Sequence, residues 1–114
     1  MKREPPYTLR QALKIARHFE KQFKPNYHIA LGGSVLHAGK SQKDIDLYIY
    51  PDSNQTVRGV DAREIMHELE RMGASIERVL LGIPMKEGYT NKPLIQMIFK
   101  GYPIDLFFIA WESI

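Results

Sequence analysis

Apolar residues recur every three or four positions over residues 9–23, a spacing that predicts an amphipathic helix. They are Leu9, Ala12, Leu13, Ala16, Phe19 and Phe23. Thr8 directly precedes this stretch and belongs to the residue types that cap helix N-termini. Pro25 and Asn26 follow it and are expected to end the helix. The first part of the chain therefore predicts one helix with a single buried face.

The pattern after residue 26 changes to short strand-like segments interrupted by helical ones. Strands are expected at 27–31, 43–50, 75–81, 94–100 and 104–110, and helices at 34–38 and 61–72. Asp61 followed by Glu64 resembles a capping box for the longer helix, and Gly73 provides its stop. The connection before the strand at 94–100 contains Gly88 and Asn91 and suits a hairpin or a flap. This order predicts an α/β two-layer sandwich with a mixed β-sheet and helices on one face.

Length and composition narrow the class of protein. The 114 residues are expected to form a single domain over residues 1–114, and 44% hydrophobic with 25% charged residues is usual for a globular protein. No apolar run is long enough to cross a bilayer, so no membrane partner is expected. The absence of cysteine excludes disulfides and thiolate metal sites and fits a cytoplasmic location. The net charge of +3 permits a nucleic-acid partner without arguing for one.

Two aspartates, Asp44 and Asp46, lie two positions apart in the alternating segment 43–50. Alternate residues of a strand project from the same face, so both carboxylates are expected side by side. Such carboxylates repel each other unless a cation lies between them. Mg²⁺ is usually bound through one or two carboxylates together with phosphate oxygens. We therefore expect Asp44 and Asp46 to be metal ligands; the alternative is a pair of ordinary solvated acids.

A glycine turn precedes these acids. The apolar run at 27–31 leads directly into Gly32, Gly33 and Ser34. Glycine lets the backbone approach a phosphate closely, and the N-terminus of the following helix favours an anion. The Ser34 hydroxyl can also donate a hydrogen bond to a phosphate oxygen. We interpret the segment as a phosphate cradle; the alternative is a tight turn without a ligand.

A third acid, Asp105, stands alone in the otherwise apolar segment 104–108. Burying it there is unfavourable unless it is paired or binds a metal. If its strand neighbours that of Asp44 and Asp46, three carboxylates converge, enough for two metal ions roughly 3.5–4 Å apart. The alternative is a solvated aspartate at the edge of a strand after Pro103.

These motifs together resemble a known superfamily. The sequence resembles the pattern of the DNA polymerase β-like nucleotidyltransferases in three features. They are Gly32-Gly33-Ser34, Asp44-x-Asp46, and Asp105 in a later strand. The stretch GGSVLHAGKSQKDIDLYIY is most similar to the small members, the minimal nucleotidyltransferases, and to the catalytic palms of aminoglycoside and tRNA nucleotidyltransferases. The resemblance covers about residues 27–108. It implies the fold of a nucleotidyltransferase palm.

The resemblance also implies a reaction. A nucleoside monophosphate would pass from a nucleoside triphosphate, expected to be ATP, to a hydroxyl of a protein, RNA or small-molecule acceptor, with Mg²⁺ or Mn²⁺ as cofactor. The catalytic metal ligands would be Asp44, Asp46 and Asp105, and the nucleotide-binding residues Gly32, Gly33, Ser34, Lys40 and Lys43. The two lysines lie just before the Asp-x-Asp motif; the alternative is that both are simply solvated.

Larger members of the superfamily carry a further domain that grips base or acceptor, whereas this chain stops four residues after Ala110. Selectivity for the base and for the acceptor is therefore expected from a helical partner protein, from a second copy in a homo-oligomer, or from the loops at 52–59 and 85–92. Small relatives that act as antitoxins on a helical toxin fit this expectation. An alternative is a catalytically silent nucleotide-binding module that regulates a partner. A weaker one is a nucleic-acid-binding protein driven by its basic surface.

Overall fold

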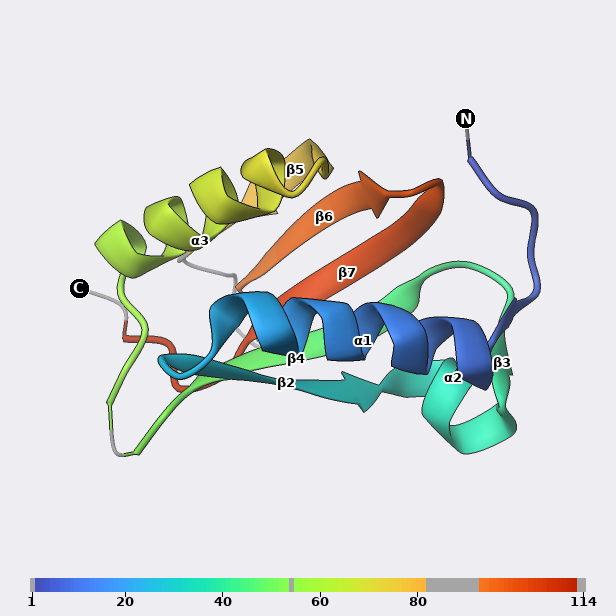
Figure 1. Ribbon diagram of the computed structural model, residues 1–114, viewed down its shortest axis with the longest axis horizontal. Coiled ribbons are helices and arrows are strands. Elements are labelled where there is room, and N and C mark those ends of the chain that lie inside the picture. The colour runs from blue at the N-terminus through green and yellow to red at the C-terminus, as the bar shows by residue number, and fades with distance from the viewer. Residues whose placement is uncertain (1, 54, 82–92, 113–114) are drawn as a thin grey trace, which may run out of the picture.

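The computed structural model describes residues 2–53, 55–81 and 93–112 (Figure 1). Three helices and seven strands are present in this part of the chain. In chain order they are β1 (Tyr7–Thr8), α1 (Leu9–Phe23), β2 (Tyr27–Gly32), α2 (Gly33–Ala38), β3 (Lys40–Ser41), β4 (Ile45–Pro51), α3 (Gly59–Arg71), β5 (Ser75–Leu80), β6 (Leu94–Phe99) and β7 (Tyr102–Phe108).

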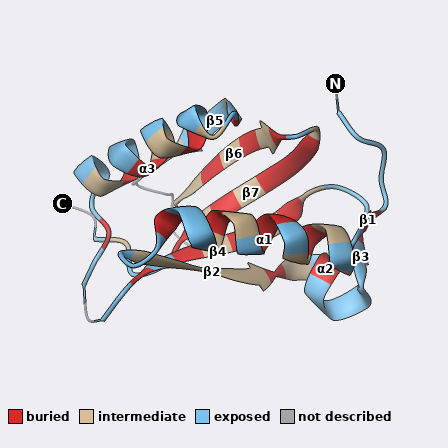
Figure 2. Cartoon of the chain, viewed as in Figure 1, coloured by how far each residue is buried: buried red, intermediate tan, exposed pale blue. Residues whose placement is uncertain are grey.

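Five strands form the main sheet, in the order β2-β4-β7-β6-β5. The central pair β4 and β7 is parallel, whereas the other neighbouring pairs are antiparallel. Helices α1 and α3 pack on one face of this sheet through a common cluster of buried side chains (Figures 1 and 2). The structure therefore confirms the predicted two-layer α/β sandwich with a mixed sheet.

Strand β4 shows how the sheet separates its two faces. Ile45, Leu47 and Ile49 are fully buried beneath the helices, while Asp46 and Tyr48 between them are only partly buried. Burying each of these aliphatic side chains contributes about 1.5–3 kcal/mol, and a register slip of one residue would exchange the two faces. The alternating pattern therefore determines that the Asp46 carboxylate points away from the core.

The two long helices begin differently from each other. Thr8 caps α1 as predicted, because its hydroxyl accepts from the Gln11 amide while the Gln11 side chain accepts from the Thr8 amide. Helix α3 starts at Gly59, two residues before the predicted start. Asp61 is consequently the third residue of α3, and its carboxylate accepts from the Arg58 amide. The prediction that Asp61 begins the helix was wrong, although its carboxylate does stabilise the first turn.

Several predicted boundaries also differ. The expected loop after α2 contains β3, whose Lys40–Ser41 pairs with Tyr7–Thr8 of β1 in a two-stranded sheet. Strand β4 begins at Ile45, so Asp44 lies just before it, and β7 covers 102–108 rather than 104–110. The predicted hairpin or flap with Gly88 and Asn91, and the candidate selectivity loop at 85–92, lie outside the described residues.

Candidate functional site

Two of the three predicted acids are partners across the central parallel strands. Asp46 of β4 and Asp105 of β7 occupy the same register position. Register partners on neighbouring strands project from the same face. On the other side of β4, Gly32 is the register partner of Asp46. The sheet therefore brings the glycine turn, the second acid of Asp-x-Asp and the third acid to one line across three adjacent strands.

The glycine turn lies against the face that carries these acids. A Cβ atom added to Gly33 would overlap the Asp46 carboxylate, and one added to Gly32 would overlap the Tyr48 ring. Gly33 also has φ +65°, a left-handed conformation that residues with a side chain rarely adopt. Both glycines are therefore required by close contact with β4, and this contact places the start of α2 beside Asp46.

A hydrogen bond from Ser41 holds the backbone of Asp44 in place just before β4. The buried Ser41 hydroxyl donates a hydrogen bond of 2.6 Å to the Asp44 carbonyl oxygen. Asp44 and Asp105 line one small pocket of about 90 Å³, together with Lys2, Glu77 and Gln96. The third acid is thus close to the first, and the three predicted carboxylates gather at the end of the sheet where β4 and β7 begin.

The environment of this cluster raises the pKa of two of its carboxyl groups. Burial raises the pKa of Asp105 to about 6, with a further contribution from the negative charge of Asp44. Gln96 opposes this shift, because its amide donates a hydrogen bond of 3.2 Å to Asp105 Oδ1 and stabilises the anion. Burial and the charge of Asp44 also raise the pKa of Asp46. Burial is the larger cause of both shifts, and the neighbouring negative charge adds to it.

A divalent cation would relieve this repulsion. The donors are carboxylate oxygens, the type that Mg²⁺ and Mn²⁺ prefer. Among the residues that the structure describes, however, no group of three or more His, Cys, Asp or Glu side chains lies close enough together to hold one metal ion. The donor chemistry fits a divalent cation, while metal binding by the three aspartates stays a prediction.

The predicted nucleotide-binding residues divide into two groups. Gly32, Gly33 and Ser34 surround the start of α2, where no side chain caps the helix and Ser34 is exposed. Lys40 and Lys43 are exposed, and neither forms an ion pair within the described part of the chain. The structure therefore unites the glycine turn with the acids but does not bring the lysines into contact with them.

Two features of this face were missed by sequence reasoning. Gln96 contacts Asp105, and as a lone amide in the apolar strand β6 it carried a signal that could have been recognised. Phe107 is only partly buried and stacks on Tyr48 with ring centroids 5.3 Å apart. The acids are therefore followed along β4 and β7 by an aromatic pair. Strand alternation places both rings on the face of the acids, but only the pairing of β4 with β7 brings them together.

Comparison with solved structures places this arrangement among known folds. The ternary P/T complex of Leishmania infantum polymerase beta superposes with a TM-score of 0.60 at 13% identity, over 94% of this chain and 44% of that one. The chain has the polymerase β nucleotidyltransferase fold. The Cid1 poly(U) polymerase mutant bound to MgATP gives a TM-score of 0.57 at 21% identity, over 87% of this chain and 30% of the other.

A cytoplasmic RNA terminal U-transferase has the same nucleotidyltransferase fold, with a TM-score of 0.53 at 21% identity. This chain spans 27% of the length of that protein and less than half of each of the other two. No protein-family model matches the sequence, and no curated protein matches it significantly. Within the described residues, no helix has both the length and the apolar character needed to span a membrane.

Proposed function

We propose that the chain is a metal-dependent nucleotidyltransferase, which moves a nucleoside monophosphate from a nucleoside triphosphate to an acceptor hydroxyl. The observation that carries the proposal is the register of Asp46 with Asp105 on adjacent parallel strands, with Gly33 against the Asp46 carboxylate. An anion-binding turn beside a cluster of carboxylates is complementary to a triphosphate accompanied by divalent cations. The shared fold with polymerase β supports the same reaction.

Each residue has a role in this proposal. Asp44, Asp46 and Asp105 would hold Mg²⁺ or Mn²⁺, which when bound neutralises charge on the phosphates. The backbone amides at Gly33 and Ser34 would bind phosphate oxygens. Lys40 of β3 and Lys43, between β3 and β4, would reach the triphosphate as exposed side chains. ATP is the nucleotide proposed.

Asp105 is the proposed general base. Its pKa of about 6 describes the metal-free cluster. A divalent cation bound beside it would lower that pKa and keep Asp105 ionised, the form that can accept a proton. The acceptor hydroxyl loses its proton to Asp105 as its oxygen forms a bond to the α-phosphorus. The bond from the α-phosphorus to the bridging oxygen breaks, and pyrophosphate leaves with that electron pair. The reaction is balanced without any further reactant.

Transfer of label from α-labelled nucleotides tests the proposal. The protein is incubated with labelled ATP, CTP, GTP or UTP, Mg²⁺ or Mn²⁺, and cell lysate, and labelled macromolecules and small molecules are then separated. We expect at least one acceptor to be labelled, and we expect Asp44→Asn with Asp46→Asn to reduce labelling by at least about 100-fold. A matched control, Glu64→Gln with Glu70→Gln, removes two exposed carboxylates from α3 and should label normally.

The opposite outcome identifies the silent binding module. If the wild type labels nothing under any condition and still binds a non-hydrolysable triphosphate, the chain is a nucleotide-binding regulator. Separate pull-downs with the wild type then determine whether a helical partner protein or a second copy of the chain occupies the face that carries the acids.

A further inference from the structure

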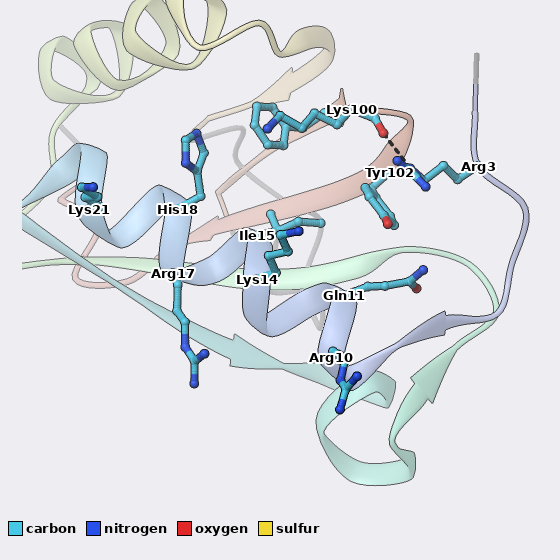
Figure 3. A pocket seen from close by; sticks show the side chains of 11 residues that line it. Arg3, Arg10, Gln11, Lys14, Ile15, Arg17, His18, Lys21, Lys100 and Tyr102 are labelled. Carbon is cyan, nitrogen blue, oxygen red and sulfur yellow. Dashed lines mark hydrogen bonds between the residues drawn. The ribbon is translucent and has the colours of Figure 1, made fainter.

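A second surface of the molecule carries a concentration of positive charge. A groove of about 680 Å³ runs between α1 and the turn that joins β6 to β7 (Figure 3). The cations that line it are Arg3, Arg10, Lys14, Arg17, Lys21 and Lys100, and no acidic residue lines it. We refer to this surface as the basic groove.

The small net charge of the chain does not reflect the positive charge of the basic groove, because acids elsewhere in the chain offset it. Helix α3 carries Asp61, Glu64, Glu68 and Glu70, whereas the only acid of α1 is Glu20. Glu20 is directed away from the basic groove, because its carboxylate contacts His28 and the Ile29 amide on β2. Helix α3, which also carries Arg63 and Arg71, has a net negative charge, whereas α1 has a net positive one. The local potential at α1 is therefore more positive than a net charge of +3 indicates.

The cations of α1 form a line. Arg10, Lys14, Arg17 and Lys21 follow each other at intervals of four, three and four residues, which corresponds to rises of about 6, 4.5 and 6 Å along the helix axis. All four are exposed. Three of them also line a neighbouring hollow of about 490 Å³ on the same helix. A regular row of charges is complementary to a ligand that repeats its negative charge along one direction.

The opposite wall of the basic groove is held in place by specific contacts. The Arg3 amide donates to the Gly101 carbonyl at 2.7 Å, and Arg3 Nε donates to the Lys100 carbonyl at 2.9 Å. The Arg3 guanidinium also lies 4.6 Å from the centre of the Tyr102 ring. These contacts fix one cation of the groove to the β6–β7 turn (Figure 3).

The β6–β7 turn adds a further cation, Lys100, to the basic groove. Lys100 has φ +50°, a conformation normally taken by glycine or asparagine, and its ammonium lies 5.4 Å from the centre of the Phe99 ring. Here the side chain adds a cation to the groove.

We propose that the basic groove binds the phosphodiester backbone of single-stranded nucleic acid. Arginine and lysine in a concave track are the usual means of following such a backbone without reading its sequence. An acidic peptide is the other polyanion of similar charge, but protein partners need apolar anchors. Ile15, Phe99 and Tyr102, the apolar residues of the groove, are all buried and offer none.

The position of the groove relative to the acids strengthens this choice. Arg3 lines the basic groove, and its neighbour Lys2 lines the small pocket beside Asp44 and Asp105. Likewise Tyr102 lines the first and Pro103 the second. The two surfaces therefore share the end of the sheet where β7 begins. The groove and the acidic site are nevertheless separate surfaces, and binding to the groove requires no nucleotide, metal or catalysis.

Fluorescence anisotropy with a labelled single-stranded uridine 20-mer, blocked at its 3′ end, tests the proposal in the absence of nucleotide and divalent metal. We expect Arg10→Gln, Lys14→Gln, Arg17→Gln and Lys21→Gln combined to weaken binding at least about tenfold, and to reduce the slope of log affinity against log salt by up to about 2.8. The matched control, Lys24→Gln, Arg63→Gln, Arg71→Gln and Arg78→Gln, removes the same charge from exposed positions outside the groove and should weaken binding much less.

Three results would overturn the proposal: no binding by the wild type, an equal loss in both quadruple variants, or equally tight groove-dependent binding of poly-glutamate. The last would assign the groove to an acidic protein. A double variant with the same change in net charge, Lys14→Glu with Arg17→Glu, gives the same answer if the quadruple variant unfolds. Asp46→Asn with Asp105→Asn should bind the 20-mer like the wild type, so this inference and the proposed catalytic activity fail independently.

Discussion

Gly33 lies directly against the carboxylate of Asp46, so that the turn before α2 and the strand β4 meet without space for a side chain. The two residues are thirteen positions apart in the sequence. Their contact joins the anion-binding half of the candidate site to its carboxylate half. Substitutions at this contact consequently test both the packing and the proposed activity.

Gly33→Ala should destabilise the protein by about 2–5 kcal/mol, from backbone strain at positive φ together with the overlap at Asp46. Gly39→Ala is the matched control, because Gly39 has φ +76° but open space around it, and should cost only about 1–2 kcal/mol. Urea unfolding measures both. Equal losses in the two variants would mean that the Gly33–Asp46 contact adds nothing beyond backbone strain.

The acid cluster should make metal-free stability depend on pH. The pKa of Asp105 rises from an unfolded value near 3.9 to about 6 in the fold. Its contribution to stability is therefore fully present below about pH 4 and is lost as pH rises through 6. Asp105→Asn should remove this decline and raise Tm at pH 7 by about 5 °C, after allowance for partial solvent screening.

Thermal unfolding of the wild type and Asp105→Asn in buffer with chelator, from pH 4 to 8, measures the difference. Glu70→Gln, an exposed carboxylate on α3, serves as the control and should follow the wild type. A wild type whose Tm declines no more steeply with pH than that of Asp105→Asn would contradict the electrostatic account of the cluster.

Gln96 should hold the pKa of Asp105 down through its amide hydrogen bond. Replacing it in Gln96→Met keeps the side-chain length and removes the donor, so the pKa of Asp105 should rise further above 6. NMR titration of the Asp105 carboxyl carbon measures this pKa directly. Gln22→Met, on the exposed surface of α1, is the control. An unchanged titration of Asp105 would show that the hydrogen bond is not maintained in solution.

Divalent metal together with nucleotide should stabilise the protein if the acids bind it. At 100 times the dissociation constant, Mg²⁺ with a non-hydrolysable ATP analogue should contribute about 2.7 kcal/mol. The shift in Tm should disappear in Asp44→Asn with Asp46→Asn and persist in Glu64→Gln with Glu70→Gln. A shift of the same size in the aspartate variant would place the metal elsewhere.

His28 connects three elements at the other end of the sheet. Its ring nitrogens lie 3.0 Å from Glu20 Oε1 on α1 and 2.9 Å from Asp52 Oδ1 after β4. Hydrogen bonds to Asp52 and Glu20 raise the pKa of His28. The resulting stabilisation is fully present below about pH 6.5 and is lost as pH rises through the higher folded pKa.

His28→Gln should consequently reduce Tm more at pH 6 than at pH 8.5. Thermal unfolding of both proteins at these two pH values provides the measurement, and His67→Gln on the exposed surface of α3 is the control. A larger loss at the higher pH would reverse the sign and exclude a charged His28 between the two carboxylates.

The sequence by itself determined the helices and the strands of the main sheet, and it indicated a candidate site. Alternation in Ile45, Leu47 and Ile49 assigned one face of β4 to the core, and Asp46 to the other, because a buried carboxylate without a partner is unfavourable. Helical periodicity and the Thr8 cap located α1 for similarly local reasons. Glycine, serine and paired aspartates in their order identified the candidate chemistry.

Only the tertiary structure decided which residues meet. Strand pairing between β4 and β7 spans some sixty residues of chain, and no local pattern specifies that Asp46 aligns with Asp105 rather than with a neighbour. The same holds for Gln96 beside Asp105 and for Arg3 against the β6–β7 turn. These contacts depend on the packing of the whole sheet against α1 and α3, which minimises exposed apolar surface globally.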